Sequence, residues 1–208
     1  MTRPLLITDC DEVLLHMVTH FGAWLDEAHD LDFALERHDF AGALTRRPDG
    51  APIAHEEVWP LLDAFFRTEM HRQTLVPHAA EALGRIGEVA DIVILTNLGW
   101  DFHGGRVAQL DAFGIRHRVV CNQGGKGRPV AGLLAEFAPT VAVFVDDLPV
   151  HHESVASHAP GVWRLHMIAE PKLAGHLPAA AHAHARIDDW AEAADWVIGR
   201  MAGGDAAA

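Results

Sequence analysis

Five short apolar runs rich in β-branched residues constrain the fold more than any other feature of this sequence. They are residues 5–9, 91–96, 118–121, 141–147 and 162–166. Most of these runs are continuous rather than alternating in polarity, which is typical of strands buried on both faces of a parallel sheet.

Segments with the period of an amphipathic helix lie between these runs. Their apolar positions are Ala82, Leu83 and Ile86; Val107 and Leu110, followed by Gly114 as the residue that ends the helix; Leu133, Leu134 and Phe137; and Ile187, Trp190, Ala194 and Val197. Strands that alternate with helices indicate βαβ units with right-handed crossovers. The sequence therefore predicts an α/β fold.

One interval, residues 16–76, departs from this alternation. It carries two helical stripes, formed by Met17, Phe21, Trp24, Leu25 and Ala28 and by Val58, Leu61, Leu62, Phe65 and Phe66. The turn-rich residues 45–52 between them predict a loop. We expect a helical cap at residues 16–76, a core domain at residues 1–15 and 77–200, a surface connection at residues 172–186 and a flexible tail at residues 201–208.

The charge of the chain argues against two classes of partner. Its 208 residues include 16 Lys and Arg against 29 Asp and Glu, a net charge of −13 with histidine neutral. Such a surface is unsuited to neutralising the phosphates of a nucleic-acid polymer or of anionic lipid. No apolar stretch approaches the roughly 18 residues of a membrane span. With two cysteines and no secretory signal, the expected location is the cytoplasm.

Polar side chains with a common chemistry follow the predicted strands. The first strand ends in Asp9 and continues to Asp11, the second ends in Thr96 and Asn97, Lys126 follows the third, and the fourth ends in Asp146 and Asp147. Ligands of open α/β sheets gather at the carboxyl ends of the strands. Two carboxylates about 5 Å apart repel by roughly 3 kcal/mol, so this many acids around one lysine require further positive charge. Mg²⁺ with a phosphate ligand meets that requirement, and the residues predict a metal–phosphate site.

These motifs resemble, in chain order, those of the haloacid dehalogenase-like (HAD) hydrolase superfamily. Asp-x-Asp-x-Val at residues 9–13, Thr96, Lys126 and the Asp146-Asp147 pair match its four motifs, and the match spans residues 5 to about 150. The resemblance implies a Rossmann-like three-layer sandwich with a parallel sheet and a helical cap inserted after the first strand. It also implies a Mg²⁺-dependent phosphatase that acts on a small phosphorylated metabolite through an aspartyl-phosphate.

The resemblance also implies a role for each matching residue. Asp9 is the expected nucleophile, and Asp11 the expected general acid and base, which favours phosphate ester hydrolysis over dehalogenation. Thr96, Asn97 and Lys126 are expected to bind the phosphoryl group. Asp146 is expected to hold Mg²⁺ with the Asp9 carboxylate and the Asp11 backbone carbonyl, and Asp147 directly or through water. Two departures stand out. Glu12 occupies a position where many relatives have glycine, and residues 127–129 (Gly-Arg-Pro) place the proline later after Lys126 than in many members.

Other functions remain open at this point. A helical insert after the first strand and an Asp-Asp-Leu-Pro sequence at residues 146–149 loosely resemble the 5′(3′)-deoxyribonucleotidases, so a mononucleotide is one candidate substrate. A catalytically silent relative that binds a phosphorylated ligand is another alternative. A signalling receiver domain is disfavoured. Receivers carry a separate phosphorylated aspartate mid-chain, before the Thr and Lys, and have no long insert, whereas in this chain the second acid pair comes last. Cys10 is predicted to pack in the core, and the pair His151-His152 is interpreted as exposed residues of a helix-start segment rather than as metal ligands.

Overall fold

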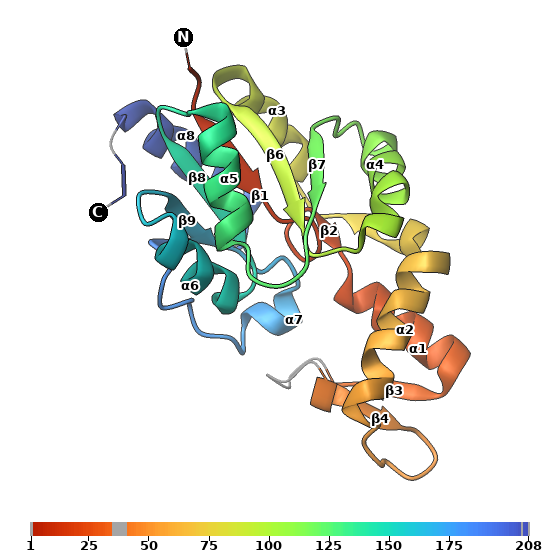
Figure 1. The fold of residues 1–208 in the computed structure, drawn as a ribbon. Coiled ribbons are helices and arrows are strands. Elements are labelled where there is room, and N and C mark those ends of the chain that lie inside the picture. The colour runs from red at the N-terminus through yellow and green to blue at the C-terminus, as the bar shows by residue number, and fades with distance from the viewer. Residues whose placement is uncertain (1, 35–40, 205, 208) are drawn as a thin grey trace.

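The computed structural model describes residues 2–34, 41–204 and 206–207, and its centre is a parallel sheet of six strands (Figure 1). Across the sheet the strand order is β10-β9-β8-β1-β6-β7. The strands are β1 (Leu5–Thr8), β6 (Asp91–Thr96), β7 (Arg118–Cys121), β8 (Ala142–Asp146), β9 (Trp163–His166) and β10 (Ala185–Arg186). All but β10 coincide with the predicted runs to within a residue at either end, and β1, β6 and β8 are largely buried, as continuous apolar runs predict.

Helices cover both faces of the sheet. Because successive residues of a strand point to opposite faces, Leu6 packs with helices α3 (Ala79–Val89) and α8 (Trp190–Gly203). Its neighbours Leu5 and Ile7 pack on the other side with α5 (Gly127–Phe137) and α6 (Pro149–His158). Helix α4 (His103–Ala112) follows the 3-10 turn η3 (Trp100–Phe102), contacts β7, and ends before Gly114 at φ +79°. The predicted α/β Rossmann-like sandwich is confirmed.

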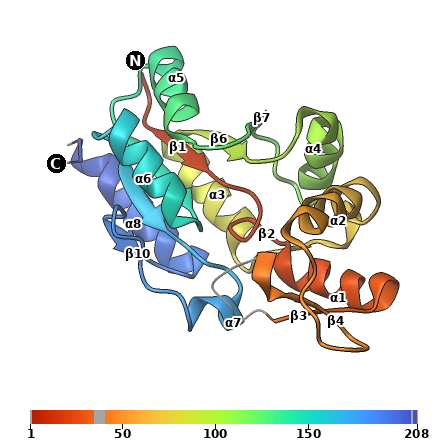
Figure 2. The same cartoon turned by 60° about the horizontal axis from the view of Figure 1, so that its bottom comes forward.

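A helical insert with its own hydrophobic core separates β1 from α3. It contains α1 (Val18–His29), α2 (His55–Thr68), the 3-10 turns η1 (Ala41–Ala43) and η2 (Met70–Arg72), and the short strands β2 (Leu15–His16), β3 (Leu31–Phe33), β4 (Leu44–Arg46) and β5 (Thr74–Leu75). Phe21, Leu25 and Phe65 are fully buried within it. Because β2 pairs with β5, the two connections between insert and sheet lie side by side. The insert lies beyond the carboxyl ends of the strands (Figures 1 and 2). Residues 35–40 of the predicted cap are outside the described part.

The structure corrects two segments predicted to be irregular. The expected loop at residues 45–52 begins with β4, which pairs with β3, and Thr45 also bridges to Pro52. The expected surface connection at residues 172–186 overlaps helix α7 (Pro171–Ala174) and ends in β10, the sheet's edge strand. Neither short strand has a β-branched run of its own. Each forms because a neighbouring strand offers it hydrogen-bond partners.

The last helix differs from its prediction at both ends. Ile187 was expected on its apolar stripe, but it lies outside the helix because Asp189 caps α8 by accepting hydrogen bonds from the amides of Ala191 and Glu192. The predicted tail was expected from residue 201, whereas α8 continues to Gly203 with Met201 buried. Residues 205 and 208 of that tail are outside the described part. Within the described ranges, no helix has the length and apolar character needed to span a bilayer.

Candidate active site

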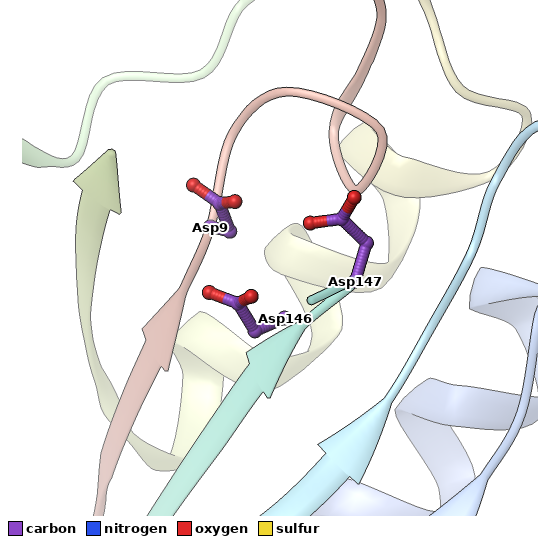
Figure 3. A group of neighbouring side chains, drawn as sticks. All are labelled: Asp9, Asp146 and Asp147. Atoms are coloured by element: carbon purple, nitrogen blue, oxygen red, sulfur yellow. The ribbon is translucent and has the colours of Figure 1, made fainter. Parts of the chain in front are cut away.

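Three aspartates meet at the carboxyl edge of the sheet, where β1 and β8 end next to each other. Thr8 is level with Val145 in the sheet register, so Asp9 follows β1 beside Asp146, the last residue of β8. Carboxylate oxygens of Asp9, Asp146 and Asp147 lie within 4.8 Å of one another (Figure 3). We call these three residues the acid cluster. The metal ligands predicted from the sequence were these three side chains together with the backbone carbonyl of Asp11.

Lys126 lies between two members of the acid cluster. Its Nζ is 2.7 Å from Asp9 Oδ1 and 2.6 Å from Asp146 Oδ2, and its side chain is completely buried. Lys126 occupies the residue before α5, and Gly127 allows that helix to start against α6. A Cβ at Gly127 would lie 2.1 Å from the Ser154 carbonyl oxygen, so a larger residue cannot fit there. Although Gly-Arg-Pro follows Lys126 where many members of the family that it resembles have proline earlier, the lysine contacts both aspartates.

The charges of the acid cluster are incompletely balanced. Burial raises the pKa of Asp9 to about 7, an effect that Lys126 opposes and Asp146 reinforces. Burial and the neighbouring Asp146 and Asp9 raise the pKa of Asp147 well above its usual value. Burial alone would lower the pKa of Lys126, but Asp146 and Asp9 outweigh it and the pKa is raised. One buried ammonium group lies against a cluster of three acids, so an additional positive charge would stabilise the ionised acids.

The donor set of the acid cluster suits a hard divalent cation. All three side chains offer carboxylate oxygens, which are the ligands that Mg²⁺ takes in proteins. Two of the three are buried, so a cation there would relieve the repulsion that burial intensifies. The residues present therefore fit the predicted Mg²⁺.

Thr96 and Asn97 end the neighbouring strand β6 in different ways. The Thr96 hydroxyl is fully buried and has no hydrogen-bond partner within the described ranges. The side-chain amide of Asn97 donates to the Gly124 carbonyl at 2.9 Å and lies 3.2 Å from His151 Nε2. Its oxygen accepts a hydrogen bond from Asn122 at 2.8 Å. The Thr96 hydroxyl thus has an unused hydrogen-bonding capacity, whereas the Asn97 side chain holds the turn after β7. The predicted phosphate contacts of both residues stay predictions.

Asp11 lies outside the acid cluster and has different partners. Arg106 Nη2 is 2.8 Å from its Oδ1 and 2.9 Å from its Oδ2, and Gln73 Nε2 donates to Oδ1 at 2.7 Å. Neither partner was predicted from the sequence. Arg106 carried one available signal, since it precedes the apolar Leu110 by four residues and so shares the buried face of its helix. Gln73 carried none.

Glu12 connects the loop after β1 to the insert. Its backbone has φ +58°, a left-handed conformation that explains why glycine is common at this position among the proteins that the motif resembles. Its Oε1 accepts hydrogen bonds from the amides of Met17 and Val18 at the start of α1, at 2.7 and 2.6 Å. Burial raises the pKa of Glu12 to about 7, although these two amides oppose the shift. Glu12 therefore ties the first helix of the insert to the active-site loop.

Two buried histidines, His152 and His166, contact backbone carbonyls of the acid cluster. His152 Nε2 lies 3.0 Å from the Asp146 carbonyl oxygen, and His166 Nε2 lies 2.8 Å from that of Asp147. Burial lowers the pKa of His152 to about 4, so its ring is neutral at pH 7 and donates from Nε2. His152 belongs to a helix, as predicted, but both His151 and His152 are buried rather than exposed. The rings of His152 and His166 contact the backbone of the metal-ligand candidates.

Comparison with known proteins identifies the fold. The chain matches no protein-family model, and no curated protein is detectably similar to it in sequence. Among solved structures, it resembles a haloacid dehalogenase-like family hydrolase from Xanthomonas campestris, with a TM-score of 0.60, 16% identity and 98% of each chain covered. A putative phosphoglycolate phosphatase from Lactobacillus plantarum gives 0.62 at 16% identity, over 94% of this chain and 99% of that one.

A third structure of this kind was solved with magnesium. The putative HAD-hydrolase YfnB from Bacillus subtilis, bound to magnesium, has a TM-score of 0.65 and 11% identity, over 95% of this chain and 99% of that one. At these identities the likeness establishes the fold, and it extends over the insert as well as the sheet. The resemblance drawn from the four sequence motifs is confirmed at this level.

Proposed function

Because the chain has the fold of the HAD-like hydrolases, we propose that it is a Mg²⁺-dependent phosphatase acting on a small phosphorylated metabolite. The observation that carries this proposal is the contact of buried Lys126 with both Asp9 and Asp146. A lysine between two strand-end aspartates supports a site in which one carboxylate attacks a phosphoryl group and the lysine offsets the charge. Two of the similar structures are described as a putative phosphoglycolate phosphatase and a putative β-phosphoglucomutase, which agrees with this class of substrate.

Asp9 is the nucleophile in this proposal. Its Oδ1 accepts hydrogen bonds from Lys126 Nζ and from the Cys10 amide, both at 2.7 Å, so Oδ2 is the oxygen that we assign to attack. A bond forms between Oδ2 and phosphorus as the bond from phosphorus to the leaving oxygen breaks. Protonated Asp11 gives its proton to that oxygen. The products of this step are an aspartyl-phosphate, the released alcohol and ionised Asp11.

Water completes the cycle in a second step. Asp11 takes a proton from the attacking water, whose oxygen bonds to phosphorus while the bond from phosphorus to Asp9 breaks. Inorganic phosphate leaves, and both aspartates return to their starting states. Thr96 donates its free hydroxyl to a phosphoryl oxygen. Mg²⁺, held by Asp9, Asp146 and Asp147, would neutralise part of the phosphoryl charge.

The proposal is tested by phosphate release from the purified protein in Mg²⁺. The panel contains an aryl phosphate, sugar phosphates, phosphoglycolate and deoxyribonucleoside monophosphates, the last of which tests a nucleotidase-like specificity. We expect Mg²⁺-dependent release that Asp9→Asn abolishes. Asp91→Asn is the matched control, because Asp91 lies exposed at the opposite end of the sheet and its variant should retain activity.

Two outcomes would contradict the proposal. If Asp9→Asn released phosphate as fast as the original protein, Asp9 would not be the nucleophile. If the original protein turned over no phosphate ester but ligands still raised its melting temperature, the chain would be a binding protein instead.

A further inference from the structure

Asp11 has an asymmetric set of hydrogen-bond partners. A carboxylate oxygen can accept hydrogen bonds along two lone-pair directions. Oδ1 of Asp11 accepts two, from Arg106 Nη2 at 2.8 Å and from Gln73 Nε2 at 2.7 Å. Among the residues that the structure describes, Oδ2 faces one donor, Arg106 Nη2 at 2.9 Å. The side chain of Asp11 remains 17% exposed, so solvent or a ligand can reach it. The two oxygens are therefore not equivalent, and Oδ2 has a lone pair to spare.

The partners of Asp11 are fixed by contacts of their own. Arg106 is completely buried, and its Nη1 donates to Gln73 Oε1 at 3.1 Å and to Gln109 Oε1 at 3.0 Å. Gln109 in turn donates to the carbonyl of Met70 in the insert. A buried guanidinium has few alternative positions, because any movement would break these hydrogen bonds without water to replace them. The group that holds Asp11 is thus rigid.

Gln73 comes from the junction between the insert and the sheet. It lies between η2 and β5, the strand that pairs with β2, and is buried. It meets Arg106 from α4, a helix of the core. The orientation of Asp11 is consequently set by one residue from the insert and one from the core. A shift of the insert relative to the sheet would move Gln73 and so change the orientation of the Asp11 carboxyl group.

We propose that Gln73 and Arg106 are positioning residues: Arg106 contacts both oxygens of Asp11, Gln73 adds a second donor to Oδ1 alone, and Oδ2 is the oxygen that transfers protons. This inference rests on the proposed phosphatase function. In the first step Oδ2 gives its proton to the leaving oxygen, and in the second it takes one from water. Without the Gln73 contact, Arg106 Nη2 alone orients the carboxyl group, which can then rotate. Oδ2 faces the leaving oxygen less often, so proton transfer is slower.

The test uses two substrates that differ in their need for an acid. An alkyl phosphate such as glycerol phosphate has a poor leaving group and depends on protonation, whereas 4-nitrophenyl phosphate depends on it much less. We expect Gln73→Leu to lower kcat for the alkyl phosphate by about tenfold or more, a modest share of what general acid catalysis contributes. KM and the aryl phosphate rate should change little. Gln73→Met, which is close to glutamine in size and uncharged but has no donor for Asp11, should show the same selectivity.

Thr74→Val is the matched control. It removes an exposed hydrogen bond to His20 at the same junction between insert and sheet but no contact to Asp11 or Arg106, so the ratio of the two rates should stay as in the original protein. A second control combines Gln73→Leu with Asp11→Asn. If Gln73 acts through Asp11, the double variant should be no slower than Asp11→Asn alone.

Each remaining outcome overturns the inference. Equal losses on both substrates, or further slowing of Asp11→Asn by Gln73→Leu, would give Gln73 a structural role and leave the phosphatase proposal intact. An original protein that hydrolyses neither substrate nor any other phosphate ester would overturn the phosphatase proposal and this inference with it.

Discussion

Replacing Lys126 with methionine removes the cation that lies between two buried carboxylates. Methionine keeps the unbranched apolar stem of lysine as far as Cε and lacks only the ammonium group, so packing changes little. The ammonium contacts Asp9 and Asp146 at 2.7 and 2.6 Å, and breaking a buried ion pair by removing one partner costs about 3–5 kcal/mol. The repulsion left between two charges about 5 Å apart, roughly 3 kcal/mol, is of the same order. We expect the free energy of unfolding of metal-free protein to fall by about 3–5 kcal/mol at neutral pH.

The loss should depend on pH in a direction that the acid cluster determines. Burial raises the pKa of Asp9 to about 7 against 3.8 in an unfolded chain. An acid whose pKa is raised on folding destabilises the folded state as pH increases between these two values. Lys126 opposes this effect by pairing with the ionised form. The deficit of Lys126→Met should therefore be largest above about pH 7 and should shrink toward about pH 5, where Asp9 is protonated.

Urea unfolding followed by circular dichroism measures this deficit in EDTA and in Mg²⁺. We expect Mg²⁺ to recover part of the lost stability, because it supplies the charge that the lysine provided. Arg118→Met is a suitable control, since Arg118 forms an exposed ion pair with Glu136 and its loss should change stability little. A Lys126→Met protein as stable as the original at about pH 8 in EDTA would refute the reasoning about the acid cluster.

Three further predictions concern the metal, the phosphoryl contact and the core. Mg²⁺ should raise the melting temperature more at about pH 8 than at about pH 5, because Asp9 and Asp147, whose pKa values are raised, must lose their protons to bind it. Scanning fluorimetry with and without EDTA at both pH values checks this, and an equal shift would contradict it. Thr96→Val should stabilise the ligand-free protein by about 1 kcal/mol in urea unfolding, since it removes a buried hydroxyl without a described partner, while lowering kcat/KM. A loss of stability with unchanged activity would count against Thr96 as a ligand. Trp190→Ala should lower the free energy of unfolding by about 3–5 kcal/mol, because the buried indole packs in the core and donates to the Val13 carbonyl at 2.7 Å. A loss below about 1 kcal/mol would contradict this.

The sheet and the acid cluster could be predicted because both follow from local sequence. A strand buried on both faces must be apolar throughout, so β1, β6 and β8 are visible as continuous runs. Parallel strands in register end at one edge, so polar residues after each run must meet. That geometry predicted a cluster of these residues at one edge, and the family resemblance implied that Asp9 and Asp146 share it as neighbours.

The partners of Asp11 could not be predicted in the same way. Arg106 and Gln73 are 95 and 62 residues from Asp11 in the chain, and neither lies at a strand end. Their contact depends on how the insert sits against α4, which no periodicity encodes. Strand β10 was missed for a related reason, because Ala185 and Arg186 become a strand only through pairing with β9. Tertiary contacts decide such elements, and the intrinsic preferences of their residues do not.

Trapping the covalent intermediate tests the central claim most directly. Protein quenched during turnover of a phosphate ester and reduced with borohydride converts an aspartyl-phosphate to homoserine, which mass spectrometry of the peptides locates. The account predicts homoserine at position 9, dependent on Mg²⁺ and absent from Asp9→Asn. Homoserine at any other position, or phosphate release by actively turning-over protein with no reducible intermediate, would contradict it.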